Sequence, residues 1–208
     1  MPLVRNPAPE DGGPRRVAVI VAHPDDEILW AGGLLLSRPQ WSLSILTLCR
    51  GKDPDRAPRF RRVLACLKAE GAMGDLDDGP DQAPLPDAAV QEAIRSLLPG
   101  GPFDLVLTHA PDGEYTWHRR HQEVARAVRT LVDQGGLAPS LWQFAYEDQG
   151  GTCLPRPKPG PSLSLPLPGP VWARKYALIT EVYGFLPGSW EARAAPHTEA
   201  FDCFQRGR

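Results

Sequence analysis

Two short segments gather side chains that can bind a metal ion or transfer protons. The segment "AHPDDE" (22–27) places an imidazole and three carboxylates directly after an apolar run. The segment "HRRH" (118–121) places two imidazoles three positions apart. Residues three apart on a helix share a face, so His118 and His121 can point the same way. The two segments therefore predict a site where imidazoles and carboxylates act together.

The elements around these segments should bring them to one edge of a sheet. Residues 17–22 form a continuous apolar, β-branched run, which is typical of a strand covered on both faces. Residues 103–109 predict another strand, and a helix is expected over 118–136. In open α/β sheets, ligands bind outside the carboxyl ends of the strands. We therefore expect the two segments to meet there.

The residue types indicate the chemistry. Imidazole nitrogen with carboxylate oxygen suits Zn²⁺, and three protein ligands with an open fourth position are typical of a catalytic site. We predict His23, Asp26 and His121 as the ligands. Asp25 and His118 then remain as acid–base groups beside the metal, as a hydrolase needs. Two histidines and one carboxylate also suit Fe²⁺, so the identity of the metal stays open.

Strand and helix patterns alternate along the chain. Strands are expected over 17–22, 41–51, 103–109 and 140–147, and helices over 28–37, 58–70, 87–98, 118–136, 174–185 and near 201–204. This alternation favours an α/β fold with a mainly parallel, doubly wound sheet. We expect a flexible leader at 1–16 and a single domain at 17–208, interrupted by a proline-rich surface excursion or lid at 150–170.

Composition excludes several other classes. The 208 residues carry a net charge of −2, which gives no sign of a nucleic-acid or anionic-membrane partner. No apolar run reaches the ~18 residues of a membrane span. The four cysteines are scattered without a CxxC pair, so we expect a reducing, cytoplasmic location. No glycine-rich phosphate loop follows the first strand, which argues against a nucleotide-binding module. The formation of a homo-oligomer stays open.

Both segments resemble motifs of a known family. "AHPDDEILWAGG" (22–33) resembles the AHPDDE motif of the N-acetylglucosaminyl deacetylases, the PIG-L or LmbE-like family. "THAPDGEYTWHRRH" (108–121) resembles the second motif of that family, a loop that ends in HxxH. A strand ending in "CRG", an arginine-bearing helix, an "LDDG" turn and a late "KYAL…VY" segment also fit the family's order. The resemblance covers about residues 16–185.

The resemblance implies a Rossmann-like three-layer sandwich that carries a zinc-dependent N-deacetylase. Such an enzyme removes the N-acetyl group from an N-acetylglucosamine-type, small-molecule sugar conjugate by attack of zinc-bound water. The family's metal ligands fall on His23, Asp26 and His121. Its general base falls on Asp25, and His118 becomes the charged partner of the developing oxyanion.

Substrate contacts are also implied by the resemblance. They fall on an arginine of the second helix, which we assign to Arg59 with Arg56 and Arg62 as alternatives, and on Asp78. Tyr115 is a candidate for stacking on a sugar ring, or else packs as an ordinary loop residue; the same two interpretations apply to Trp117.

The chain departs from the family where HPDH is often found. Arg119 and Arg120 stand between the two histidines, so the aspartate that would favour a protonated imidazole is missing. We therefore expect a lowered pKa at His118. Two alternative functions stay open: a metal hydrolase for another N-acyl substrate, and a non-catalytic binding protein that retains the fold. Glu27 is equally well interpreted as support for a ligand or as a first-turn helix carboxylate.

Overall fold

The computed structural model describes residues 3–5, 13, 15–115 and 117–206. Its helices are α1 (Asp26–Leu36), α2 (Arg56–Leu67), α3 (Asp87–Leu97), α4 (Arg119–Asp133), α5 (Gly169–Ala177), the π-helical turn η1 (Leu178–Val182) and α6 (Trp190–Ala194). Its strands are β1 (Leu3–Arg5), β2 (Arg16–Val21), β3 (Ser42–Cys49), β4 (Glu70–Leu76), β5 (Leu105–Thr108), β6 (Ser140–Phe144), β7 (Tyr146–Glu147), β8 (Arg156–Pro157), β9 (Leu163–Pro166) and β10 (Thr198–Arg206).

A central sheet orders its strands β1-β10-β6-β5-β2-β3-β4, and β9 also pairs with β10. Strands β4, β3, β2, β5 and β6 run parallel, whereas β10 is antiparallel to its neighbours. The chain order reverses between β2 and β5. The expected α/β fold, a Rossmann-like three-layer sandwich, is confirmed. The reversal places a ligand-binding crevice at the carboxyl ends of β2 and β5.

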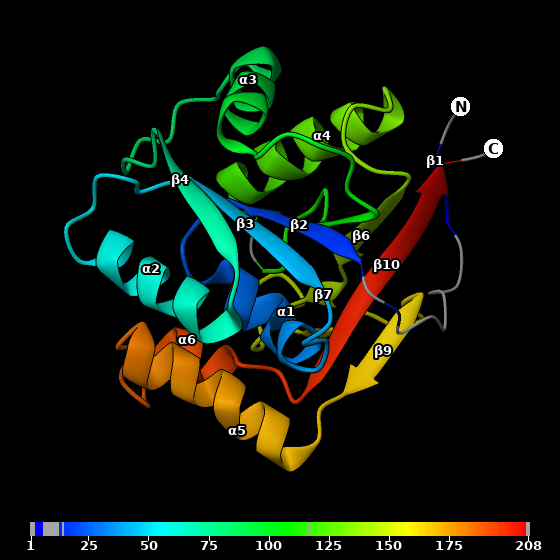
Figure 1. Ribbon diagram of the computed structural model, residues 1–208. Helices are drawn as coiled ribbons and strands as arrows, with labels where there is room; N and C mark the ends of the chain where they lie inside the picture. The colour runs from blue at the N-terminus through cyan, green and yellow to red at the C-terminus, as the bar shows by residue number, and fades with distance from the viewer. Residues whose placement is uncertain (1–2, 6–12, 14, 116, 207–208) are drawn as a thin grey trace.

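Side-chain alternation along β2 divides the core into two layers. Val17, Val19 and Val21 pack with α1, α2, η1 and α6 on one face of the sheet. Ala18 and Ile20 pack with α3 and α4 on the other face, as Figure 1 shows. Both faces of β2 are therefore dry, which explains its uninterrupted apolar sequence.

Strand β4 was missed by the sequence analysis because it contains Gly71 and Gly74. A Cβ atom on Gly71 would lie 2.6 Å from the Ile45 carbonyl oxygen, and one on Gly74 would lie 2.7 Å from that of Leu48. Both glycines therefore permit the close approach of β4 to β3. Glycine weakens a strand pattern, so the sequence indicated no strand over these residues.

The C-terminal part differs from the sequence-based expectations. The prediction of a short helix near 201–204 is wrong, because these residues lie in β10, where Phe201 and Cys203 pack into the core. The proline-rich segment 150–170 contains β8, β9 and the start of α5. Within the expected leader, Leu3–Arg5 forms β1, and residues 1–2, 6–12 and 14 lie outside the described residues. Among the described residues, no helix is long and apolar enough to cross a membrane.

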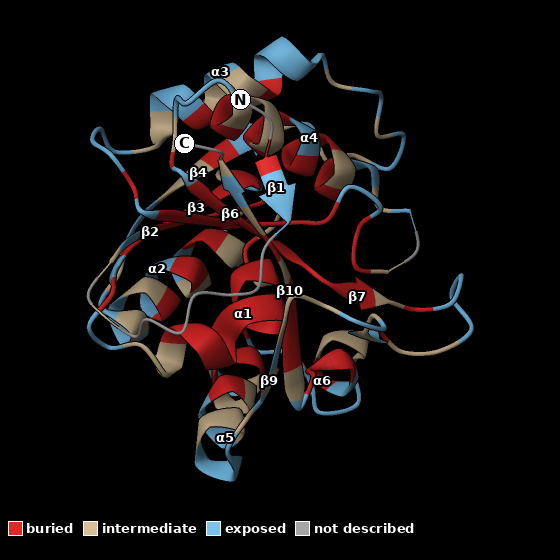
Figure 2. Ribbon diagram, turned by 90° about the vertical axis from the view of Figure 1, so that its right-hand side faces the viewer, coloured by how far each residue is buried: buried red, intermediate tan, exposed pale blue. Residues whose placement is uncertain are grey.

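A buried ion pair anchors α1, the helix that carries the first motif. The Lys175 ammonium donates to Glu199 at 2.6 Å, and neither side chain is exposed. The Glu199 carboxylate also accepts the backbone N–H groups of Gly33 and Leu34, each at 2.7 Å. Helix α1 is buried along most of its length, as Figure 2 shows, so its position depends on this carboxylate being held.

Replacing Lys175 by Met should lower the free energy of unfolding by about 3–5 kcal/mol, because the Glu199 charge then stays buried without its partner. Lys52→Met is the matched control, since Lys52 pairs with Asp75 on the surface. Urea unfolding of both variants measures the difference. Equal, small losses in both variants would contradict this account of the buried pair.

Candidate metal centre

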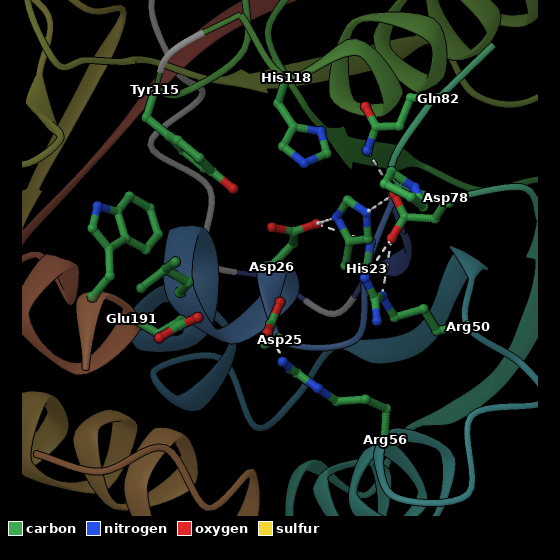
Figure 3. A pocket seen from close by; sticks show the side chains of 14 residues that line it. His23, Asp25, Asp26, Arg50, Arg56, Asp78, Gln82, Tyr115, His118 and Glu191 are labelled. Carbon is green, nitrogen blue, oxygen red and sulfur yellow. Dashed lines mark hydrogen bonds and ion pairs between the residues drawn. The ribbon is translucent and has the colours of Figure 1, made fainter. Parts of the chain in front are cut away.

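The two sequence segments meet at the carboxyl ends of β2 and β5. His23 follows β2, and His118 and His121 belong to the start of α4, after the loop that follows β5. His23 and His118 line a cavity of about 230 Å³ together with Asp25, Asp26 and Tyr115 (Figure 3), and His121 contacts His23 without lining the cavity itself. The expectation that the segments share one edge of the sheet is therefore met in this structure.

Three potential ligand atoms face one another at the inner end of this cavity. His23 Nδ1 lies 3.3 Å from Asp26 Oδ2 and 3.3 Å from His121 Nε2. His121 Nε2 lies 3.4 Å from Asp26 Oδ2. The three atoms thus form a nearly equilateral triangle built from the residues that the sequence analysis chose as ligands.

Hydrogen bonds on the far sides of the rings turn the lone pairs inward. Glu114 Oε2 lies 2.7 Å from His121 Nδ1, and Asp78 Oδ1 lies 3.1 Å from His23 Nε2. A carboxylate only accepts, so these ring nitrogens carry the protons. When both imidazoles are neutral, as metal binding requires, His23 Nδ1 and His121 Nε2 face the Asp26 carboxylate with their lone pairs. Burial alone would lower the pKa of His23, but the hydrogen bonds to Asp26 and Asp78 raise it to about 10, so without a metal ion its Nδ1 also holds a proton. Lone pairs that converge in this way can bind a cation.

The spacing fits zinc. Ligand atoms about 2.0–2.1 Å from a tetrahedral zinc ion lie about 3.3–3.4 Å from one another. The observed separations of 3.3, 3.3 and 3.4 Å match that edge length. The residues present therefore fit a divalent metal held by two imidazoles and one carboxylate, and two of these three residues, His23 and Asp26, line the cavity.

A fourth histidine, His109, is an alternative ligand that geometry disfavours. Its Nε2 lies 3.4 Å from Asp26 Oδ2, close enough to join a trio with His121. However, the Ala22 backbone N–H donates to this same nitrogen at 2.9 Å, which occupies its lone pair. The His109 ring stacks on His121 at 3.8 Å, so it serves as a wall for that ligand.

Asp25 occupies a strained backbone position at the cavity. Its φ of 135° is rare for any residue but glycine. Burial raises the pKa of its carboxyl to about 7, and the charge on Asp26 adds to this, while Arg56 opposes it. The Arg56 guanidinium donates to Asp25 Oδ2 at 2.5 Å. Asp25 is therefore a carboxylate poised to gain or lose a proton near neutral pH.

Glu27 helps to hold this strained position. It is fully buried, and its Oε2 accepts the Asp25 backbone N–H at 3.0 Å. Its Oε1 accepts the hydroxyl of Tyr183, and burial raises the pKa of Glu27 to about 8. These contacts match neither interpretation fully, because Glu27 supports the backbone of Asp25 and contacts none of the three candidate ligands.

His118 lines the cavity opposite Asp25. Burial lowers its pKa to about 3, and the neighbouring His121 and His23 rings add to this. The direction agrees with our expectation, but the cause differs, because Arg120 donates to Glu123 and to loop carbonyls instead. These surroundings favour a neutral imidazole and therefore disagree with the charged His118 that the resemblance implied.

The arginine assigned to the substrate is better placed at another position. Arg59 does not line the cavity; it contacts Asp55 and the Tyr183 carbonyl oxygen. Arg56, one helical turn earlier, lines the cavity and contacts Asp25. The structure therefore favours Arg56 over Arg59. Asp78 lines the cavity as expected.

No protein-family model matches the sequence. The uncharacterized protein L374 of Acanthamoeba polyphaga mimivirus is 23% identical over 143 residues, which cover 62% of this chain and 61% of that relative. The match thus spans less than two thirds of the relative's length.

Solved structures are similar over nearly the whole chain. The conserved protein TT1542 from Thermus thermophilus has a TM-score of 0.59 at 18% identity, with 90% of this chain and 94% of that chain covered. A zinc-inhibited form of the teicoplanin deacetylase Orf2 has a TM-score of 0.62 at 16% identity, with 91% and 97% covered. The A40926 pseudoaglycone deacetylase Dbv21 has a TM-score of 0.56 at 17% identity, with 91% and 96% covered. The chain therefore has the same fold as these three structures, two of which are described as deacetylases.

Within this fold, sequence reasoning missed three residues that lie around the candidate ligands. They are His109, Glu114 and Arg50, which contact Asp26, His121 and Asp78 respectively. The only available signal was their position at strand ends, because His109 directly follows β5 and Arg50 directly follows β3. Glu114 lies in a loop, where sequence spacing predicts no direction for the side chain.

The strain at Asp25 predicts an inverted stability order. Asp25→Gly should be more stable than Asp25→Ala by about 1–2 kcal/mol, because both lose the carboxyl but only glycine accepts the positive φ without strain. Urea unfolding of the metal-free variants measures this difference. At Glu92, an exposed residue within α3, the same pair should show the ordinary order, with Ala more stable than Gly. The ordinary order at Asp25 would remove the strain argument.

Proposed function

We propose that this protein is a zinc-dependent N-deacetylase that acts on an N-acetylglucosamine-type sugar conjugate. The observation that carries the proposal is the inward-facing triangle of His23 Nδ1, Asp26 Oδ2 and His121 Nε2, set beside the carboxyl of Asp25. The likeness to deacetylases of teicoplanin and of the A40926 pseudoaglycone supports the reaction type. The chosen substrate class follows from the sequence motifs.

A metal in this site would be held by His23, Asp26 and His121. When bound, it supplies Lewis-acid activation of a water molecule and of an amide carbonyl. The same donor set suits Fe²⁺, so the assay must compare metals. Because one structural neighbour is described as a zinc-inhibited form, each metal is best added at one equivalent.

Asp25 is the general base in this proposal. Arg56 holds its Oδ2, which leaves Oδ1 to accept the proton of the attacking water. A carboxyl with a pKa of about 7 is well matched to this role, since it is available as a base near neutral pH and can return the proton to the leaving amine. The strained backbone and the Glu27 contact fix where this carboxyl stands.

His118 faces the same cavity from the opposite loop. Since burial keeps its imidazole neutral, it acts as an N–H donor to the oxygen that becomes negative, without a charge of its own. Its Nδ1 is buried and has no hydrogen-bond partner among the described residues.

The aromatic wall of the cavity is suited to the apolar face of a sugar ring. Tyr115 and Trp190 both line the cavity, and their rings lie 4.4 Å apart. Trp117, by contrast, is 81% exposed and borders a neighbouring cavity. Of the two candidate stacking residues, Tyr115 is therefore the one at the site. A cavity of about 230 Å³ accepts one small group rather than a whole conjugate.

Asp25→Asn should keep the metal and lose turnover by about 10²–10⁴-fold, because the amide cannot accept the proton. Acetate release from a panel of N-acetylglucosamine conjugates and other N-acyl compounds measures the loss, and plasma mass spectrometry measures the metal. His197→Gln is the control, since His197 stacks on Trp172, and neither residue lines the cavity.

Near-parent turnover in Asp25→Asn would reject the base assignment. A parent that holds metal but releases acetate from no sugar conjugate would shift the function to another N-acyl substrate. If that parent cleaves nothing in the panel, the non-catalytic interpretation replaces ours.

A further inference from the structure

We propose that two carboxylates, Asp78 and Glu114, act as positioning residues that each fix one imidazole ligand from its far nitrogen. Arg120 holds the loop that carries Asp78. This inference rests on the metal site of the proposed function and adds a specific account of what keeps its two histidines in place. Neither carboxylate would touch the metal or the substrate.

Glu114 fixes His121. The Glu114 side chain is fully buried, and its Oε2 lies 2.7 Å from His121 Nδ1 and 2.9 Å from His109 Nδ1. Its Oε1 accepts the Ala110 backbone N–H at 2.9 Å. His109 is itself held by the Ala22 N–H, so the chain of contacts runs from the end of β2 to the ligand. The ring of His121 can neither flip nor change its tautomer without breaking this chain.

Asp78 fixes His23, and its four acceptor positions are filled. Oδ1 lies 3.1 Å from His23 Nε2 and accepts the Gln82 amide at 3.0 Å. Oδ2 accepts from Arg50 Nε at 3.0 Å and lies 2.7 Å from Arg50 Nη2. A carboxylate offers about four lone-pair sites, so none is left for a substrate hydroxyl. The structure thus favours positioning over the substrate contact that the resemblance implied.

Arg120 extends the same arrangement to the loop around Asp78. Its side chain is only 1% exposed, and it donates to the carbonyl oxygens of Asp77 and Ala83, the latter at 2.9 Å. Glu123 neutralises it within α4. The Arg120 guanidinium therefore ties both ends of the 77–83 loop to the helix that begins beside His121. One helix thereby positions both imidazole ligands.

This arrangement has a measurable consequence for metal affinity. A carboxylate on the far nitrogen selects the tautomer, orients the ring and makes the metal-facing nitrogen more basic. Loss of such a partner commonly weakens metal binding by about 10–100-fold. Because each carboxylate serves a different ligand, either loss alone should weaken binding.

The test is the Zn²⁺ dissociation constant, measured by competition with a chromogenic chelator. Glu114→Gln and Asp78→Asn should each bind Zn²⁺ about 10–100-fold more weakly than the parent. An amide is neutral and can turn its N–H₂ group toward the ring N–H, so it no longer holds the imidazole in one orientation. Asp112→Asn and Asp81→Asn are matched controls from the same two loops. Both residues are exposed, and within the described part of the chain neither forms a hydrogen bond or ion pair with a histidine. Both controls should bind like the parent.

Two further readouts separate positioning from folding. The melting temperature of each metal-free variant reports any general loss of stability, and the visible spectrum of the Co²⁺-loaded protein reports ligand geometry. A double-mutant cycle combines the paired change Arg120→Met/Glu123→Gln with Asp78→Asn. If Arg120 acts through Asp78, the loss of Zn²⁺ affinity in the combined variant should be smaller than the product of the two separate losses.

Parent-like affinity and an unchanged Co²⁺ spectrum in both carboxylate variants would overturn the inference while leaving the proposed function intact. A parent that binds none of Zn²⁺, Co²⁺ and Fe²⁺ would overturn both. Weakened binding that only follows a lower melting temperature, with an unchanged Co²⁺ spectrum, would assign the carboxylates to folding and also reject the inference.

Discussion

The site depends on three lone pairs that point at one another. His23 Nδ1, Asp26 Oδ2 and His121 Nε2 lie 3.3–3.4 Å apart, and in the neutral rings that bind a metal the ring protons are directed to Asp78 and Glu114. Without a metal ion, these electron pairs lie close together in a buried place, and a proton on His23 offsets them, as the raised pKa of about 10 of that residue indicates. With a metal ion, the repulsion becomes ligation. The surrounding buried contacts hold the three atoms in this arrangement.

The topology of the sheet brings these three atoms together from distant parts of the chain. The order of strands reverses between β2 and β5, so the loops after these two strands face each other across a crevice. The first motif delivers His23 and Asp26 from one side, and α4 delivers His121 from the other. Helix α1 cannot drift from this position, since Glu199 binds its backbone from β10. A distant ion pair and the candidate metal centre are thereby parts of one scaffold.

Sequence spacing could predict residues whose direction is set by regular structure. Asp26 opens a helix, and His121 lies in the first turn of another, so the alternation of strands and helices predicts that both lie at one edge of the sheet. Glu114 could not be found this way, because the direction of a loop side chain depends on the tertiary fold. The choice between Arg56 and Arg59 failed for a related reason: one helical turn separates them, and only the packing of α2 decides which one faces the cavity. Likewise, the glycines of β4 looked like breakers until their contact with β3 was seen.

The most direct test of the account is an anomalous-difference map, collected at the zinc absorption edge, from crystals of the protein loaded with one equivalent of Zn²⁺. The account predicts one peak within bonding distance of His23 Nδ1, Asp26 Oδ2 and His121 Nε2. Asp78 and Glu114 should remain on the far ring nitrogens. A peak bonded to His109 or to Cys49, or no peak near His23, would contradict it.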